Sequence, residues 1–109
     1  MLNFLVDSGN YASRKVGRDN FEWGFVSTAK VSDGTHPYET AVEHNKYGDG
    51  KMVIVAAYDT RAEAEAGHAA WVATMTTEPL PPVLRDCCNS GISQVCRAFG
   101  ESLDKEYNA

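Results

Sequence analysis

The feature that most constrains the fold is the passage from an apolar run into a capped, alanine-rich segment. Residues 52–57, Met-Val-Ile-Val-Ala-Ala, are apolar at every position, which is typical of a strand covered on both faces. The segment that follows begins with Thr60-Arg61-Ala62-Glu63, a capping box in which each outer side chain accepts a hydrogen bond from the other residue's backbone amide. A strand over 51–58 and a helix over 61–76 are therefore predicted in direct succession.

One face of the predicted helix is apolar. Its members recur at spacings of three and four residues and are Ala64, His68, Trp71, Val72 and Met75. A tryptophan buries more apolar surface than any other side chain in such a stripe. We therefore expect the helix to pack across a sheet with Trp71 as its main anchor.

The chain before the helix has the pattern of antiparallel strands. Apolar and polar residues alternate over 21–30, where Phe21, Trp23, Phe25, Ser27 and Ala29 share one face, and this period of two predicts a half-buried strand. A turn over 32–37 leads to a second strand over 38–44, and a glycine-containing hairpin loop over 45–50 follows it. These strands and the run at 51–58 should form one antiparallel sheet.

The two ends of the chain have weaker patterns. A short first strand near 2–6 is followed by a loop or mobile arm over 9–20. Prolines 79, 81 and 82 make 78–82 a rigid extended connector. Beyond it a helical stripe runs from Ile92 through Val95, Cys96 and Phe99 to Leu103, with Asn89 or Ser90 as its cap, and the polar tail 104–109 should be frayed.

The predicted fold class is α+β: a three- to four-stranded antiparallel sheet with one helix packed across it and a second, C-terminal helix. Residues 1–109 form a single domain, divided into an N-terminal strand and arm (1–20), a core sheet and helix (21–77), and a Pro-rich connector with the C-terminal helix (78–109).

Charge and cysteine content restrict the partners and the compartment. The chain has 15 acidic and 10 basic side chains and a formal charge of -5, which disfavours binding to long nucleic acids. Its apolar runs are much shorter than the ~20 residues of a membrane span, so no membrane association is expected. Three cysteines cannot form a closed disulfide framework, which indicates reduced thiols and a cytoplasmic location, the host cytoplasm if the protein is viral.

No known catalytic or cofactor-binding motif occurs in the chain. Cys87 and Cys88 are adjacent rather than spaced as zinc ligands, and Cys96 fits a core position of the predicted last helix better than a metal site. The sequence therefore predicts a protein that is not an enzyme, with no catalytic residue, no metal and no cofactor.

Candidate ligand-binding residues lie in the arm and on the faces between sheet and helix. Arg14, Arg18 and Trp23 combine cations with an aromatic ring, as a small nucleotide site requires, although a solvated loop before a core strand has the same composition. His44 and His68 could meet between sheet and helix, or could simply be satisfied buried histidines.

Glu39 and Glu43 share the other face of the strand 38–44. At ~13 Å apart they cannot act together on one bond. They mark either a partner-binding acidic face or a solvated surface.

The segments Pro37-Tyr38-Glu39-Thr40 and Tyr58-Asp59-Thr60-Arg61-Ala62-Glu63-Ala64-Glu65-Ala66-Gly67-His68 resemble a group of small tailed-phage proteins of uncharacterised function. The resemblance covers roughly residues 23–75. It implies a viral accessory protein made in an infected bacterium, where such proteins often bind a host enzyme, a defence complex or its nucleotide signal, and it assigns no catalytic role.

Three functions follow as hypotheses. The first is a non-enzymatic phage protein that binds and inhibits a host protein or defence complex, through a sheet edge or the face with Glu39 and Glu43. The second is a small-molecule (nucleotide) binding or sequestering protein, in which an oligomer forms pockets lined by Arg14, Arg18, Trp23 and His68. The third is a minor virion structural protein. Association into a homo-oligomer is expected separately, because a chain this small carries several large aromatic side chains, Trp23, Phe25, Trp71 and Phe99.

Overall fold

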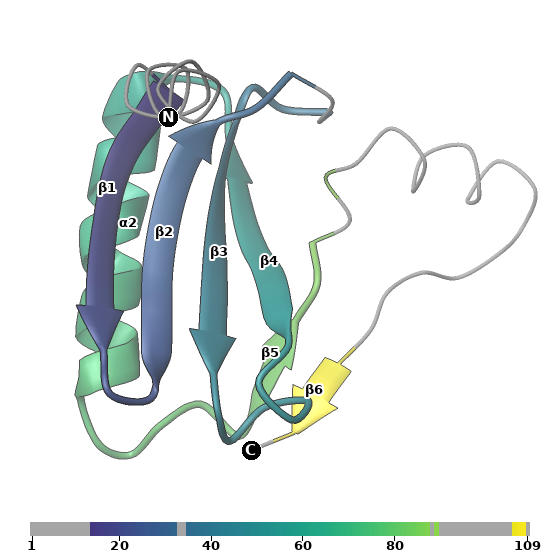
Figure 1. Cartoon of the computed structure of the whole chain (residues 1–109). Helices are drawn as coiled ribbons and strands as arrows, with labels where there is room; N and C mark the ends of the chain where they lie inside the picture. Colours follow the sequence, from purple (N-terminus) through teal and green to yellow (C-terminus); the bar gives the residue numbers. More distant parts are fainter. Residues whose placement is uncertain (1–13, 33–34, 88, 90–105, 109) are drawn as a thin grey trace, which may run out of the picture.

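The computed structural model of the 109-residue chain describes residues 14–32, 35–87, 89 and 106–108. Four strands follow one another as an antiparallel meander in the order β1-β2-β3-β4. Figure 1 shows them side by side, with the helix α2 behind them. The strands are β1 (Lys15–Phe21), β2 (Gly24–Lys30), β3 (Tyr38–His44) and β4 (Met52–Tyr58), and α2 spans Arg61–Thr76.

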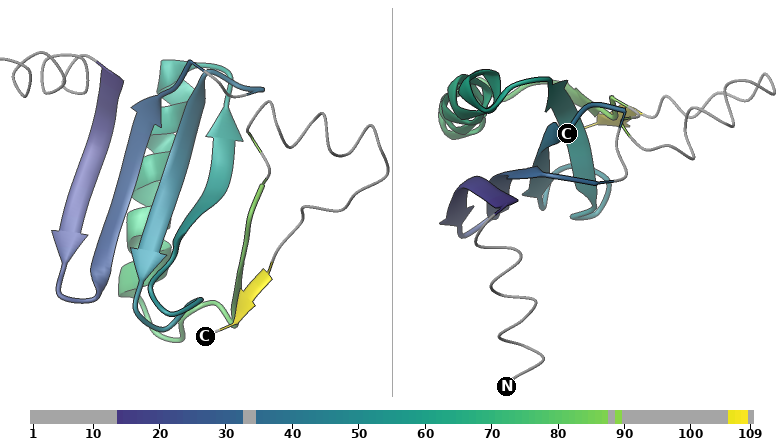
Figure 2. Two further views of the ribbon diagram at one scale, coloured as in Figure 1. Left: turned by 45° about the vertical axis from the view of Figure 1, so that its right-hand side comes forward. Right: turned by 90° about the horizontal axis from the view of Figure 1, so that it is seen from above.

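The α+β class and the four-stranded antiparallel sheet under one helix are confirmed. Figure 2 shows from above that α2 lies on one side of the sheet only, and α2 contacts all four strands. The bounds of β3 and α2 are those predicted from the sequence, and β4 begins one residue later than expected.

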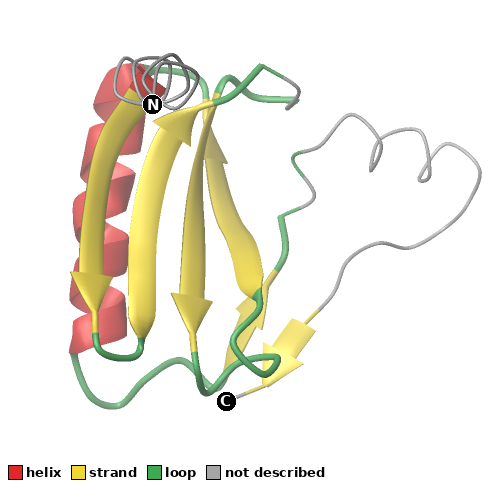
Figure 3. Cartoon of the chain, in the orientation of Figure 1, coloured by secondary structure: helices red, strands yellow, loops and turns green. Residues whose placement is uncertain are grey.

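The end of the chain differs from the prediction. Two short strands, β5 (Val83–Arg85) and β6 (Glu106–Asn108), pair antiparallel as a separate small sheet (Figure 3). Part of the tail expected to be frayed is therefore held by backbone pairing, which a polar sequence does not reveal. In the described part of the chain no second helix follows α2; the stripe from Ile92 to Leu103 falls in residues 90–105, outside the described residues, as do the first strand near 2–6 and Cys88.

The expectation of a loop over 9–20 is wrong for its second half, because Lys15–Phe21 forms β1. The strand pairs with β2 through a register shift between Lys15 and Gly17. Most of its residues are exposed or half-buried, since it is the edge strand of the sheet. An edge strand that buries little apolar surface has no alternating pattern from which it could be predicted.

The predicted strand 21–30 is interrupted by a turn at Glu22 and Trp23. Gly24 ends this turn with φ +146°, and a Cβ atom there would overlap the backbone carbonyl of Glu43 on β3. Only glycine fits such a position. Beyond it, the fully buried residues of β2 are Val26 and Thr28, so the helix-facing side is the one with the smaller side chains.

The capping box at the start of α2 is confirmed, with Thr60 Oγ1 accepting from the Glu63 amide at 3.1 Å and Glu63 Oε1 accepting from the Thr60 amide at 3.2 Å. The helix buries Ala64, His68 and Met75 against the sheet. Trp71, predicted as the main anchor, is partly buried and packs against the core, while Met75, 1% exposed, is the helix's largest fully buried side chain.

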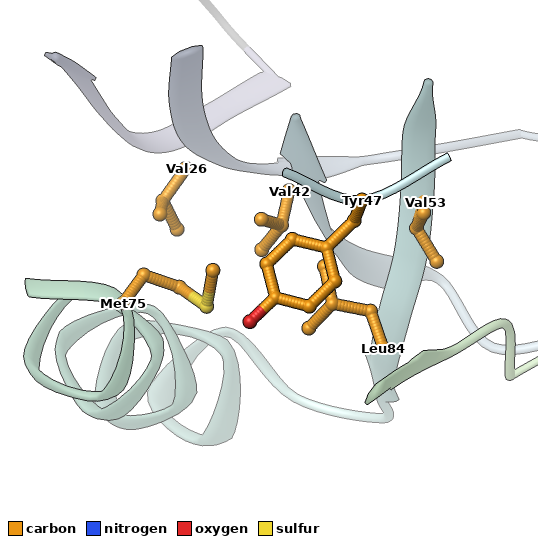
Figure 4. Packing of buried hydrophobic residues seen from close by; sticks show 6 residues of the cluster. All are labelled: Val26, Val42, Tyr47, Val53, Met75 and Leu84. Carbon is orange, nitrogen blue, oxygen red and sulfur yellow. The ribbon is translucent and has the colours of Figure 1, made fainter. Parts of the chain in front are cut away.

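Figure 4 shows the centre of the core. Val26, Val42 and Val53 form one row across β2, β3 and β4, and Met75 of α2 and Leu84 of β5 pack onto this row. Tyr47, from the β3–β4 loop, lies among them with no exposed surface, and its hydroxyl donates to the Pro81 carbonyl at 2.5 Å. This bond ties the proline connector to the core.

Candidate functional site

A chain of hydrogen-bonded side chains crosses the interior between α2 and the sheet. His68 Nε2 lies 2.8 Å from Asp19 Oδ2, and His68 Nδ1 lies 2.7 Å from Thr28 Oγ1. Thr28 Oγ1 is 2.6 Å from Thr40 Oγ1, which is 3.0 Å from the Tyr58 hydroxyl. We call these five residues the His68 chain.

The order carboxylate, imidazole, hydroxyl is also the order of a nucleophilic triad. A nucleophile must be reached by its substrate. Thr28 and Thr40 have no exposed surface, so the hydroxyls that would act are sealed beneath α2. The His68 chain satisfies buried polar groups and joins β1, β2, β3, β4 and α2.

Two glycines make room for the His68 chain. A Cβ atom on Gly17 would lie 2.8 Å from Cδ2 of the His68 ring, and one on Gly67 would overlap the ring and hydroxyl of Tyr58. The contact with Tyr58 therefore explains why a glycine occurs inside the helix at position 67, although glycine is unfavourable there by ~1 kcal/mol. Burial is the main cause that raises the pKa of Tyr58, against the hydrogen bond from Thr40.

Aromatic rings stack at the other end of the helix. The rings of Phe21 and Trp23 are 4.5 Å apart and nearly parallel at 10°, and those of Trp23 and His44 are 4.5 Å apart at 24°. Tyr47 meets the His44 ring edge-on at 5.3 Å. Both faces of Trp23 are therefore occupied by neighbouring rings.

His44 is 4% exposed, and its Nδ1 atom accepts a hydrogen bond from the Lys46 backbone amide at 3.0 Å. Burial, with a smaller contribution from the charge of Lys46, lowers the pKa of His44. The ring is consequently neutral near pH 7. A neutral imidazole that accepts at Nδ1 carries its hydrogen on Nε2.

A pocket of about 350 Å³ opens beside this stack, and we call it the Trp23–His44 cleft. Its lining combines apolar side chains with charged groups near the end of α2: Trp23, His44, Asn45, Lys46, Met75, Thr76, Glu78 and Leu80.

The side of the sheet opposite α2 is the outer face. It carries a shallow hollow of about 220 Å³ whose lining is mostly apolar: Arg18, Phe25, Ser27, Ala29, Val31, Glu39, Ala41, Met52 and Ile54. Met52 is 57% exposed, and the Arg18 guanidinium lies 4.1 Å from the centre of the Phe25 ring. An apolar sheet face at the surface indicates an interaction site.

The predicted ligand residues do not form one site within the chain. Trp23 and His44 come together in the cleft, whereas Arg18 lies on the outer face and Arg14 precedes β1. His44 and His68 have separate partners and do not form the predicted pair. They occupy the same side of the sheet, but His44 is opposite Gly24 and His68 bonds Thr28, four residues further along β2.

The two predicted partner-binding residues, Glu39 and Glu43, both belong to β3, where they alternate with the helix-facing Thr40 and Val42. Glu39 lines the hollow, and its Oε2 atom accepts from Asn89 Nδ2 at 2.8 Å. Asn89 also bonds the His36 backbone through both side-chain atoms, so it holds the β2–β3 loop.

The described residues contain no group of three or more His, Cys, Asp or Glu side chains that could hold a metal ion. The backbone amide of Cys87 donates to the Ile54 carbonyl at 2.8 Å. Among the same residues no helix has the length and hydropathy needed to cross a membrane.

A scan against protein-family models found no match for this sequence, and neither did searches of curated proteins and of solved structures. The fold and sites on their own define an α+β protein with one covered and one open sheet face and a small cleft at the end of its helix.

Sequence reasoning missed most of the cleft. Lys46 belongs to a hairpin loop, Glu78 and Leu80 belong to the proline connector, and Met75 is a core residue of the helix. Segments so far apart in the chain meet only because the β1–β2 turn, the β3–β4 loop and the C-terminal end of α2 lie at the same end of the molecule (Figure 1). The usable signals were Trp23, an aromatic ring beside the basic arm, and His44, an imidazole at the end of a strand face that is otherwise buried.

Proposed function

We propose that the protein is a non-enzymatic interaction protein that binds, and thereby blocks, a protein of the bacterial host through its outer face. The observation that supports this is the apolar hollow on the side of the sheet opposite α2, where Met52 of β4 is exposed. A protein partner would remove this surface from water, and burial of apolar area stabilises a complex by roughly 25 cal/mol per Å².

The charges around the hollow suggest the chemistry of the partner. Glu39 and Arg18 line the hollow, Glu43 lies between Phe25 and Met52 in the strand register, and the whole chain has a formal charge of -5. Complementary charge speeds association and excludes wrong partners. The partner surface should therefore present apolar side chains inside a basic rim.

The sealed hydroxyls of the His68 chain support the non-enzymatic part of the proposal, because a substrate cannot reach this carboxylate–imidazole–hydroxyl series of the described residues. The resemblance over residues 23–75 supports the phage origin and hence the host partner.

The test is capture of a host protein from bacterial lysate by the wild type and by two matched variants. Met52→Asp places a charge in the hollow at an exposed site, and Ala70→Asp places the same charge on the exposed side of α2. We expect one protein to be captured by the wild type and by Ala70→Asp and to be lost with Met52→Asp. Equal capture by all three proteins would contradict the proposal.

Light scattering of the purified protein tests whether the outer face binds a second copy of this chain instead of a host protein. A dimer that Met52→Asp converts to a monomer would show that the outer face serves self-association, and the host-binding proposal would then fail.

A further inference from the structure

We propose that the Trp23–His44 cleft binds a small ligand that carries one carboxylate on an apolar body. This site lies on the helix side of the sheet, so it is separate from the outer face and does not depend on the function proposed above.

The first argument is a hydrogen-bond donor that has no partner within the fold. In the described residues no buried side-chain nitrogen or oxygen lacks a hydrogen bond. His44 Nε2 forms none there, although the residue is 96% inaccessible, so this single atom must be one that solvent reaches. A ring that lines a cleft and has an N–H without a partner among the described residues can donate to a ligand there.

The charges of the cleft select the acceptor. Lys46 and Glu78 contribute one charge of each sign, and the neutral His44 adds a donor. A carboxylate can accept from the Nε2 hydrogen and be attracted by the ammonium group, and such charge-assisted bonds are about twice as strong as neutral ones. A phosphate dianion is disfavoured, because Glu78 would repel it and only one cation, Lys46, lines the cleft. A cationic ligand is disfavoured, because the His44 N–H is a donor and offers a cation no acceptor.

The shape of the aromatic stack excludes a nucleobase sandwiched on Trp23. Phe21 covers one face of the indole and His44 covers the other, each at 4.5 Å between ring centres. A ligand therefore contacts the indole edge together with Met75 and Leu80. A volume of about 350 Å³ is near the lower limit of small-molecule sites, which is roughly 300 Å³.

The primary test is titration of the whole protein with phenylpropionate and with its uncharged amide, followed by calorimetry and by amide NMR shifts. We expect saturable binding of the acid with shifts at Trp23, Met75 and Leu80. The amide should bind about tenfold more weakly, since its carbonyl still accepts the hydrogen bond but lacks the charge that strengthens this bond and that Lys46 attracts. Equal affinity for acid and amide, shifts confined to other residues, or no saturation would overturn the proposal.

Two lysines of the same loop provide matched variants. Lys46 and Lys51 are both exposed, and only Lys46 lines the cleft. Lys46→Met should weaken binding of the acid several-fold, and Lys51→Met should leave it unchanged. Equal affinities of both variants would contradict the role of Lys46. His44→Asn, which keeps an acceptor for the Lys46 amide but removes the Nε2 donor, should weaken the binding of both ligands, and of the acid more than of the amide.

A free metabolite and the C-terminus of a peptide both present such a carboxylate. A short peptide that ends in leucine, with its C-terminus free or amidated, distinguishes the two. Tighter binding of the free-ended peptide than of phenylpropionate assigns the cleft to a chain terminus, and the reverse order assigns it to a small metabolite. Capture of the host protein by Lys46→Met tests the outer face separately.

Discussion

His68 and His44 both lie between α2 and the sheet, and they differ in what their second nitrogen does. Both nitrogens of His68 are bound, one to Thr28 and one to Asp19. His44 uses Nδ1 within the fold and keeps Nε2 for what enters the cleft. Burial alone therefore does not distinguish a structural histidine from a binding one; a complete set of partners does.

The largest effect is expected from His68→Ala. The substitution removes the partner of Thr28 and Asp19 and leaves a void beneath α2, which should lower the free energy of unfolding by about 2–4 kcal/mol. Urea denaturation measures this loss. His36→Ala is the control, because the His36 side chain is 46% exposed and its pair with Asp59 should contribute at most about 1 kcal/mol. Losses of equal size would remove the distinction between the His68 chain and a surface pair.

The next largest loss of stability is expected from Gly67→Ala. Alanine normally stabilises a helix by ~1 kcal/mol relative to glycine. Here the added methyl group overlaps the Tyr58 ring, and overpacking of this kind is unfavourable by about 1–3 kcal/mol. We expect a lower melting temperature. Ala70→Gly, at an exposed position of the same helix, should also lower it, by the propensity alone. A more stable Gly67→Ala protein would mean that Tyr58 can leave the His68 chain without loss.

Thr40→Val tests whether the hydrogen bonds inside the His68 chain contribute to stability. The shape is kept, but the hydroxyl between Thr28 and Tyr58 is removed, so a loss of about 1 kcal/mol is expected. In a double-mutant cycle with Tyr58→Phe the two losses should add to more than the loss of the double variant, because both changes break one shared bond. Simple additivity, measured by denaturation of all four proteins, would contradict the connection.

The smallest effect concerns pH and His44. Because burial lowers the pKa of His44 in the folded chain, the unfolded chain binds the proton more readily. The folded state therefore has its full stability above pH 6.5, the ordinary pKa of histidine. It loses stability as the pH falls through the lowered pKa that His44 has in the folded chain. Lys46, Tyr47 and Glu78 are the ionisable groups around the ring.

Denaturation at several pH values measures this loss in the wild type and in His44→Asn, which does not titrate there. The wild type should lose more stability than His44→Asn between neutral and mildly acidic pH. Parallel curves would show that His44 is not linked to folding.

The sequence predicted the parts of the fold that have a local pattern. The capping box fixed the start of α2 at Arg61, and the alternation over 38–44 gave β3 its correct bounds. β1 was not predicted, because an edge strand buries too little apolar surface to require alternating apolar and polar residues. The alternation on β2 left open which face is covered; α2 packs on the face of Val26 and Thr28, where His68 bonds Thr28.

The candidate sites were less predictable. Trp23 and His44 could be named from the sequence, but their contact depends on the pairing of Gly24 with His44, which no local pattern specifies. The hollow on the outer face is built from one to three residues of each strand, so it becomes visible only when the register of all four strands is known.

The shift in register at the start of β1 has a consequence for how the protein behaves at high concentration. β1 is an outer strand of the sheet, a place where a strand of another molecule could add by backbone pairing and begin a fibril. The irregularity between Lys15 and Gly17 bends the ladder there, and Lys15, Arg18 and Asp19 surround it with charges of both signs. A bent and charged border is a poor template for further growth, so prolonged agitation should leave the native protein free of amyloid-dye fluorescence.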